Sequence, residues 1–267
     1  MKNKGIIITL IIILSILVFG MILFLVEILN ESKPIPMKIG IFGLKNKNEQ
    51  IVYDEKYDLK NINNIKIKQD VGNLKIEKST EENIRVVIKG KNNENINVNS
   101  DNEQLIIECL ENNNAKNIFN IGINEKDIII YLPENYSKEI NIDSNNVDCE
   151  IDDVENANIN IKCDLGNVKV GKIYNLNVVC DCGNIEINTV LNKCKLEANL
   201  GNINIENIQI KENSTIEADL GNIEIENIND IFVDAKVDFG DFKINKNNKN
   251  SEIILKIVCD LGNVKIK

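Results

Sequence analysis

The sequence predicts an all-β fold: a parallel β-helix, or solenoid, with about 20 residues per coil, preceded by one N-terminal transmembrane α-helix. A short phrase, Asp-x-Gly-Asn followed by alternating apolar residues, recurs along the second half of the chain. Its glycines lie 17, 18, 20, 19 and 22 residues apart. A period of this length is typical of repeat architectures. The predicted turn glycines are Gly72 in an early copy and Gly166, Gly183, Gly201, Gly221, Gly240 and Gly262 in the regular series.

An alternation of apolar and polar residues surrounds each of these glycines. Apolar residues occupy every second position before the glycine, for example Ile161, Cys163 and Leu165, and the alternation resumes after it. A period of two predicts a strand with one buried face. Each unit is therefore expected to be strand, tight turn, strand and polar connector. Glycine supplies the positive φ of such a turn, and in the degenerate copy at residues 143–146 we expect Asn145 to replace it.

Two folds satisfy this pattern, a stack of antiparallel hairpins and a solenoid whose equivalent strands pair in parallel. Like residues at equivalent positions favour the solenoid, because they would stack about 4.8 Å apart along one column. We expect the residues directly before the glycines to form one such interior column: Leu165, Cys182, Leu200, Leu220, Phe239 and Leu261.

An apolar run near the N-terminus, residues 6–26, begins at Ile6 and ends at Val26. This length predicts a membrane-spanning helix. A cleaved signal peptide and a buried core helix are the alternatives, but no Ala-x-Ala-like cleavage site follows. Lys2 and Lys4 precede the run, so the positive-inside rule predicts a single-pass plasma-membrane protein with a cytoplasmic N-terminus and an extracytoplasmic C-terminal domain.

The chain divides into four predicted parts. Residues 1–30 are the cytoplasmic tip and anchor helix, and residues 31–56, with two of the three prolines, are a juxtamembrane stalk. Residues 57–138 predict irregular β-coils or a small sandwich-like cap, and residues 139–267 predict regular solenoid repeats. Because the last strand is followed by no capping helix, we expect this edge to pair with a partner protein or with a second copy of the chain.

Composition excludes several classes of function. The formal net charge is −10, and the chain has no histidine or tryptophan. Nucleic-acid binding needs basic surface and stacking aromatics, so no nucleic acid is expected as a partner. Without histidine the commonest general base is missing, and neither Gly-x-Ser-x-Gly nor a phosphate-binding glycine loop occurs. We therefore expect no enzyme and no cofactor.

Seven cysteines are present, and six of them fall in the repeats. These six are expected on inward columns, where a thiol behaves as a small hydrophobe: Cys149, Cys163, Cys180, Cys182, Cys194 and Cys259. Two alternatives are a disulfide between Cys163 and Cys180 on successive coils and a zinc site that adds Cys182.

The repeated turns also create two polar columns. The first holds mostly aspartates: Asp143, Asp164, Asp181, Asn199, Asp219, Asp238 and Asp260. The second holds mostly asparagines: Asn146, Asn167, Asn184, Asn202, Asn222, Asp241 and Asn263. We expect each Asp to cap its own turn and the amides to hydrogen-bond along the stack. The alternative is a calcium ladder held by Asp164, Asp181, Asp219, Asp238 and Asp260.

The Asp-x-Gly-Asn series, the early unit at Asp70-Val71-Gly72-Asn73 and the segment Asp-Ile-Ile-Ile-Tyr-Leu-Pro at residues 127–133 together resemble a bacterial "putative adhesin" family. These are β-strand-repeat envelope proteins of unknown function, related to the head domain of autotransporter adhesins. The resemblance covers residues 57–267. It implies a right-handed β-solenoid, often behind one membrane anchor, and in some members a link to envelope stress. The family has no established catalytic residues.

These observations favour a non-enzymatic, membrane-anchored extracytoplasmic scaffold that binds a protein or an envelope glycan. One alternative is an accessory protein of cell-envelope stress signalling. A second is a carbohydrate-active β-helix enzyme, which would need a pair of carboxylates that breaks the repeat at one coil and lies in a groove.

Overall fold

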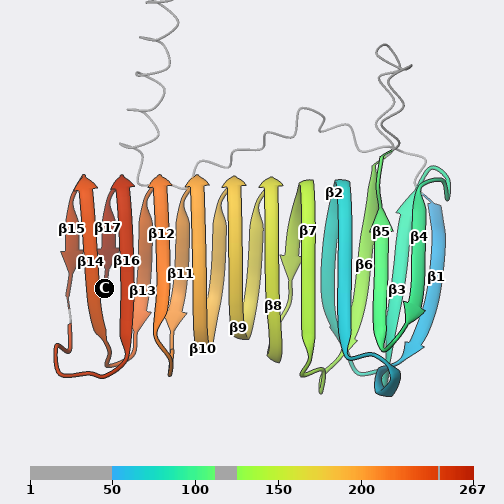
Figure 1. Cartoon of the computed structure of the whole chain (residues 1–267), viewed down its shortest axis with the longest axis horizontal. Helices are drawn as coiled ribbons and strands as arrows, with labels where there is room; N and C mark the ends of the chain where they lie inside the picture. The colour runs from blue at the N-terminus through green and yellow to red at the C-terminus, as the bar shows by residue number, and fades with distance from the viewer. Residues whose placement is uncertain (1–49, 112–124, 246) are drawn as a thin grey trace, which may run out of the picture. The chain divides into compact units, whose positions relative to one another are not determined.

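The computed structural model describes residues 50–111, 125–245 and 247–267, which belong to one compact unit. These residues form a single 17-stranded sheet wound into a solenoid (Figure 1). The described residues contain one short 3₁₀ helix and no α-helix, so none of their helices has the length and apolar character needed to span a bilayer. The predicted transmembrane segment at residues 6–26 lies outside the described residues, as does most of the predicted stalk.

The bounds of the elements follow the predicted alternation. The N-terminal elements are β1 (Gln50–Asp58), η1 (Leu59–Asn61), β2 (Asn64–Ser79), β3 (Asn83–Gly90), β4 (Ile96–Asp101), β5 (Gln104–Cys109) and β6 (Lys126–Pro133). The longer regular strands are β7 (Glu139–Ile151), β8 (Val154–Leu165), β9 (Val168–Cys182) and β10 (Ile185–Leu200). The last coils hold β11 (Ile203–Ile208), β12 (Ser214–Leu220), β13 (Ile223–Ile228), β14 (Phe232–Phe239), β15 (Phe242–Ile244), β16 (Ile254–Leu261) and β17 (Val264–Ile266).

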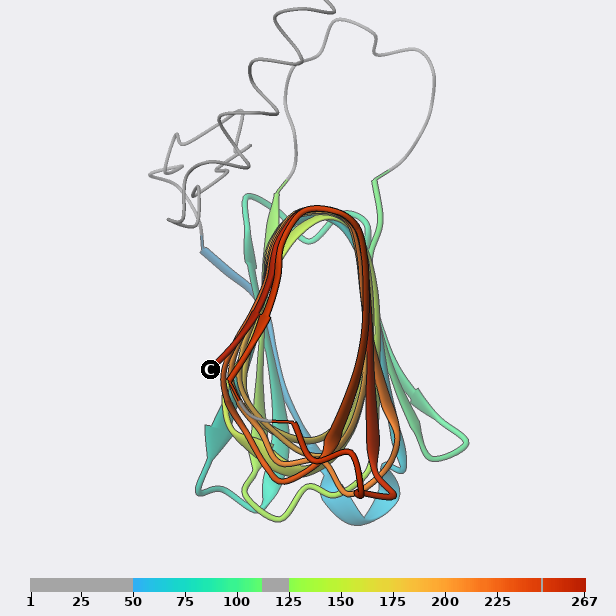
Figure 2. The same ribbon diagram turned by 90° about the vertical axis from the view of Figure 1, so that its left-hand side faces the viewer.

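Equivalent strands of neighbouring coils pair in parallel and in register. Ile185 of β10 pairs with Ile203 of β11, which in turn pairs with Ile223 of β13. Seen along the axis, the coils superimpose as a flattened ring with one strand on each side (Figure 2). This confirms the parallel solenoid over the stack of antiparallel hairpins. The handedness of the winding stays a prediction.

Aliphatic side chains from both sides of the ring fill the interior. Ile185, Ile203 and Ile223 are fully buried, and residues at alternate positions along each strand share this environment. A single coil cannot bury enough apolar area to offset the entropy of ordering it, so each coil depends on its neighbours.

The order of the last three coils differs from their order in the chain. β16 pairs with β12 on one side and with β14 on the other, and β17 likewise lies between β13 and β15. The C-terminal coil is therefore internal, and the coil of β14 and β15 is outermost. The prediction that the C-terminal strands form the solenoid edge is wrong.

The size of the inward side chains explains this insertion, because Leu255 and Ile257 of β16 pair with the smaller Val233 and Ala235 of β14. On β16, Leu255, Ile257 and Cys259 are fully buried, whereas Ala235 and Val237 of β14 remain half-buried. The more apolar coil gains most from neighbours on both sides, and the more polar coil is left at the end.

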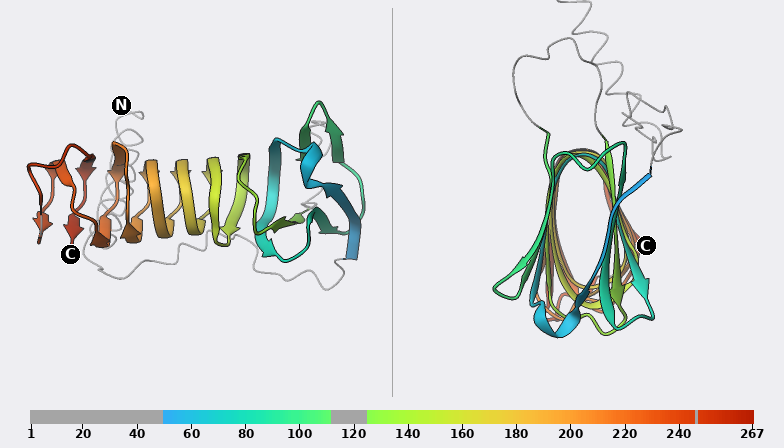
Figure 3. Two further views of the ribbon diagram at one scale, coloured as in Figure 1. Left: turned by 90° about the horizontal axis from the view of Figure 1, so that it is seen from below. Right: turned by 90° about the vertical axis from the view of Figure 1, so that its right-hand side faces the viewer.

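The N-terminal end combines parallel and antiparallel pairing (Figure 3). β2 pairs in parallel with β5, β6 and β7, while β3 with β6, β4 with β5 and β1 with β3 pair antiparallel. The N-terminal coils are thus part of the same sheet as the regular repeats and carry additional antiparallel strands. Within the described residues, β1 already includes Gln50, which lies inside the region predicted as stalk and ahead of Tyr57.

Candidate functional site

The most regular surface of the molecule is the row of turns at the repeat glycines, which we call the glycine corner. Gly183 and Gly201 have φ values of +158° and +153°, and the other five predicted turn glycines are also positive. A Cβ on Gly201 would lie 1.9 Å from the carbonyl oxygen of Gly183. Backbone packs directly on backbone here, so a side chain at this position cannot be accommodated.

The degenerate copy is two residues out of phase with the predicted alignment. Gly72 pairs with Val147, and Asn73 pairs with Asp148, so Val147 occupies the glycine position and the prediction for Asn145 is wrong. Asn145 instead occupies a position in the aspartate column, and its side-chain amide donates to Asp70 Oδ1 at 2.7 Å. The physical reason is that Val147 does not adopt a positive φ, so this copy needs no turn glycine.

A ladder of side chains follows the glycines. The backbone N–H of Asn202 donates to Asn184 Oδ1 at 2.9 Å, and that of Asn222 donates to Asn202 Oδ1 at 2.8 Å. The side-chain amides add weaker bonds along the same stack, which confirms the predicted amide ladder. In stacking order the ladder consists of Asp148, Asn167, Asn184, Asn202, Asn222, Asn263 and Asp241, so Asp148 replaces the predicted Asn146.

The residues directly before the glycines point outward, and their predicted interior column is wrong. Leu165 is 47% exposed, Leu200 45% and Phe239 73%. The chain bends after the last inward residue. The register shows this bend, because Cys163 pairs with Cys180 and Leu165 with Cys182, but the aspartates between them do not pair. We call this row the apolar ridge; in stacking order it consists of Leu165, Cys182, Leu200, Leu220, Leu261 and Phe239.

An acidic column lies one residue before the apolar ridge. Its carboxylates do not cap their own turns anywhere in the described ranges, contrary to the prediction. Asp181 accepts from Asn199 Nδ2 at 3.0 Å, and Asp238 pairs with Lys236 at 2.8 Å, which raises the pKa of that lysine. Asp143 falls outside this column, because it pairs with Lys162. In the part of the chain that the structure describes, no three acidic or thiol side chains converge as metal ligands.

The thiols lie mostly in the interior. Cys149, Cys163, Cys180, Cys194 and Cys259 are buried as predicted, and so is Cys109, but Cys182 lies on the apolar ridge. All are free thiols. Burial raises the pKa of Cys194 to about 12 and that of Cys259 to about 11, so these groups remain protonated and unreactive.

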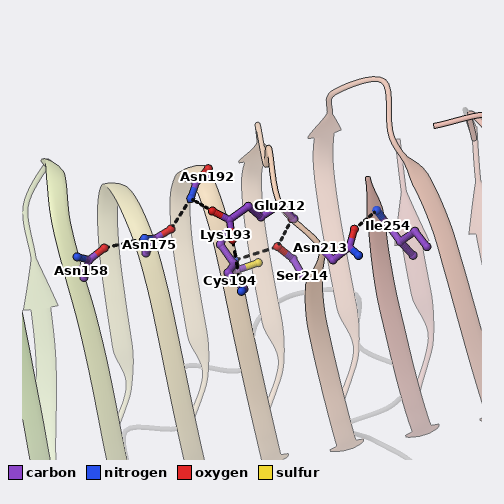
Figure 4. Close-up of polar contacts among 9 residues, drawn as sticks. All are labelled: Asn158, Asn175, Asn192, Lys193, Cys194, Glu212, Asn213, Ser214 and Ile254. Atoms are coloured by element: carbon purple, nitrogen blue, oxygen red, sulfur yellow. Dashed lines mark hydrogen bonds and ion pairs between the residues drawn. The ribbon is translucent and has the colours of Figure 1, made fainter. Parts of the chain in front are cut away.

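A second polar ladder lines the opposite, connector corner, and the sequence analysis missed it (Figure 4). Asn175 Nδ2 donates to Asn158 Oδ1 at 2.7 Å, and Asn192 Nδ2 donates to Asn175 Oδ1 at 2.9 Å. Asn192 also donates to Glu212 Oε1 at 3.0 Å, and this bond together with Lys193 lowers the pKa of Glu212. The signal was available, since the three asparagines are spaced 17 residues apart.

Ser214 shows how this corner tolerates a lapse in the apolar pattern. The side chain is 3% exposed on a column that otherwise carries apolar residues. Its hydroxyl accepts from the N–H of Cys194 and donates to the carbonyl oxygen of Glu212, both at 3.0 Å. The buried hydroxyl is thus fully satisfied.

Comparison with known proteins identifies related folds. The family model of Toastrack DUF4097 matches residues 62–267. A crystal structure of a "putative adhesin" from Bacteroides fragilis NCTC 9343 is similar, with a TM-score of 0.53 and 19% identity, covering 82% of this chain and 97% of that one.

Two further crystal structures show weaker similarity. A "putative cell adhesion protein" from Clostridium sporogenes ATCC 15579 has a TM-score of 0.41 and 14% identity, covering 82% of this chain and 98% of that one. A "putative lipid binding protein" from Parabacteroides distasonis ATCC 8503 has a TM-score of 0.43 and 15% identity, covering 83% and 98%. No curated protein is detectably similar to the chain.

Proposed function

Because the chain belongs to the Toastrack DUF4097 family, we propose that it is a non-enzymatic, adhesin-like scaffold that binds an extracytoplasmic protein or envelope glycan along its glycine corner. The family match confirms the resemblance inferred from the sequence. The observation that carries the proposal is the apolar ridge, in which one partly or largely exposed apolar residue recurs per coil beside a mostly acidic column; Leu165 and Leu200 are 47% and 45% exposed.

The geometry of the apolar ridge supports an extended ligand. Its residues repeat at the spacing of adjacent parallel strands, about 4.8 Å. The amide ladder and the backbone contacts of Gly183 and Gly201 hold the row rigidly, so little conformational entropy is lost on binding. A contiguous row of exposed apolar side chains rimmed by polar groups is typical of an interaction surface.

Several observations support a binding role over catalysis. Carboxylates of the acidic column recur in every regular coil but that of Asn199, as expected of a repeated surface rather than of one acid–base pair. The chain lacks histidine altogether. The Bacteroides fragilis structure, described as a "putative adhesin", supports the same role through its fold.

Membrane anchoring is part of the proposal. The apolar run at residues 6–26 would hold the solenoid outside the plasma membrane. A C-terminal tag on the full chain should then be digested by protease in cells whose outer surface is accessible and whose membrane is intact. A tag that is protected until the cells are lysed would contradict this orientation.

The test of the function uses a deletion strain of the native host complemented with variants of the full chain. The double variant Leu165→Ser and Leu200→Ser removes two exposed side chains of the apolar ridge. Ile51→Ser, on the 58% exposed Ile51 of β1, is the matched control. Attachment to surfaces should fall in the deletion strain and in the double variant, and should be restored by wild type and by Ile51→Ser.

One outcome would decide against the scaffold, and another against the apolar ridge as its binding surface. If attachment is unchanged by deletion while an envelope-stress reporter responds, the chain acts in stress signalling. If the double variant restores attachment as well as wild type at equal surface abundance, the ridge is not the binding surface.

A further inference from the structure

The outermost coil, made by β14 and β15, has an unpaired edge. Within residues 50–111, 125–245 and 247–267, no strand pairs with β14 or β15 on the side away from β16 and β17. Unpaired strand edges expose backbone donors and acceptors that pair readily with another strand. This edge is therefore the place where the solenoid can be extended.

One residue already closes part of the edge. The N–H of Phe232 bonds to Ile253 of the neighbouring coil, so the backbone groups of Val233 face away from it. The side chain of Asn247 hydrogen-bonds both of these backbone groups. Its Oδ1 accepts from the N–H of Val233, and its Nδ2 donates to the carbonyl oxygen of Val233, each at 2.9 Å. By the same alternation, the backbone groups of Val237 and Ile244 face outward nearer the glycine corner. Among the described residues, the side chain of Asn247 hydrogen-bonds only to Val233 and does not cover these groups.

The uncovered part of the edge is apolar at its centre. Phe239 is 73% exposed and Phe242 is 42% exposed, the largest aromatic exposures in the described chain. Val237 and Ile244 next to them are only half-buried, although equivalent residues of inner coils are fully buried. Asp238 and Lys243 lie between these residues on the outer face, and both are exposed.

We propose that this end binds the same end of a second copy of the chain, about a two-fold axis at the turn of Gly240 and Asp241. β14 runs toward the turn and β15 runs away from it. The axis therefore places β14 of one copy antiparallel to β15 of the other, an arrangement that closes after two copies.

The residues on the two strands are self-complementary in this register. Val237 faces Ile244 of the second copy, so two inward apolar residues meet and the core continues across the interface. Phe239 faces Phe242 of the second copy, which covers both exposed rings. Asp238 faces Lys243 of the second copy, and each of these pairs forms twice.

The charges of Asp238 and Lys243 make the pairing of the two copies specific. Asp238 already contacts Lys236 on its own strand, and the second copy supplies Lys243 on the facing strand. Opposite charges directly across an antiparallel pair stabilise it, and like charges destabilise it. The N-terminal end offers no such match, because its edge strands β1 and β4 belong to antiparallel pairs, and Asp54 of β1 is already paired with Arg85.

The test measures association of the purified full chain in mild detergent by sedimentation velocity over a range of concentrations. Wild type should form a dimer. Asp238→Lys and Lys243→Asp, each alone, place like charges opposite one another twice and should weaken dimerisation about tenfold or more. In an equimolar mixture of the two variants every interface charge faces its opposite, so dimers should form again.

Two controls make the same charge changes in the middle of the solenoid: Glu186→Lys and Lys195→Asp. Both residues are exposed on β10 and should leave dimerisation unchanged. Because Asp238 and Lys243 are exposed, the circular dichroism spectra of all variants should match wild type, and so should their Tm at concentrations at which wild type is monomeric.

A chain that stays monomeric at every concentration would overturn the proposal. So would a dimer that persists undiminished in both single variants, which would place the association elsewhere in the chain, or a mixture that fails to recover.

Discussion

The glycine corner and the connector corner join the same strands in different ways. At the glycine corner, two residues separate the strands in every regular coil from β8 onward; for example, β10 ends at Leu200 and β11 begins at Ile203. At the connector corner, the chain runs on as one strand in β10, whereas nine residues separate β15 from β16. At the first corner the glycine backbones of successive coils are in direct contact beside the amide ladder and leave no room for a side chain, whereas at the second corner side chains such as Asn175 and Asn192 lie between the coils. The number of residues between the strands is therefore uniform at the glycine corner, where backbone contacts leave no room for variation, and varies at the connector corner, where side chains fill the space.

The largest effect is expected from Gly201→Ala at the glycine corner. The added Cβ would lie 1.9 Å from the carbonyl oxygen of Gly183, and the φ of +153° is unfavourable for alanine. We expect the free energy of unfolding, measured by urea denaturation, to fall by about 4 kcal/mol or more. Asn175→Ala at the connector corner is the comparison and should cost about 1 kcal/mol. Equal losses in the two variants would remove the distinction between the corners.

An intermediate effect is expected where the amide ladder is broken. Asn202→Leu removes the oxygen that accepts the N–H of Asn222 and should cost about 1–3 kcal/mol. Asn202→Asp keeps an acceptor oxygen and should lose less stability. Asp148 already accepts a backbone N–H in this way at the start of the ladder. Equal denaturation midpoints for the two variants would show that this hydrogen bond contributes little.

A smaller effect is expected from Ser214→Ala at the connector corner. The substitution leaves the buried N–H of Cys194 without its acceptor, which should cost about 1–2 kcal/mol. Ser214→Thr retains the hydroxyl and serves as the control. The comparison can be made by thermal unfolding, and a Ser214→Ala variant as stable as wild type would mean that another group replaces the hydroxyl.

The smallest effect is expected from Glu212→Gln, and it depends on pH. Hydrogen bonds from Asn192 and Lys193 lower the pKa of Glu212 in the folded chain. The ionised form therefore stabilises the fold above the unfolded pKa of about 4.3, and this contribution is lost as pH falls through the lower folded value. Wild type should exceed the variant in Tm at pH 7, and the difference should shrink at pH 3. A difference that is the same at both pH values would contradict this assignment.

Local patterns determined much of this protein. The alternation of apolar and polar residues predicted the strands and the buried positions of Cys163, Cys180 and Cys259, because inward or outward direction within a strand follows from its period of two. The recurrence of like residues at equivalent positions predicted the parallel coils. The glycine spacing predicted the corner, because one backbone conformation recurs in each coil. The asparagine after each glycine predicted the ladder for the same reason.

Only the tertiary structure decided what depends on comparing coils or on the angle of a bend. The alternation placed Leu165 and Leu200 inside, but the chain turns before it reaches the glycine, and that bend directs both side chains outward. Chain order placed the C-terminal coil at the edge, but β16 buries more apolar surface than β14 and lies between β12 and β14. Residue spacing encodes the shape of one coil, while the choice of neighbours depends on which coils gain most from burial on both sides.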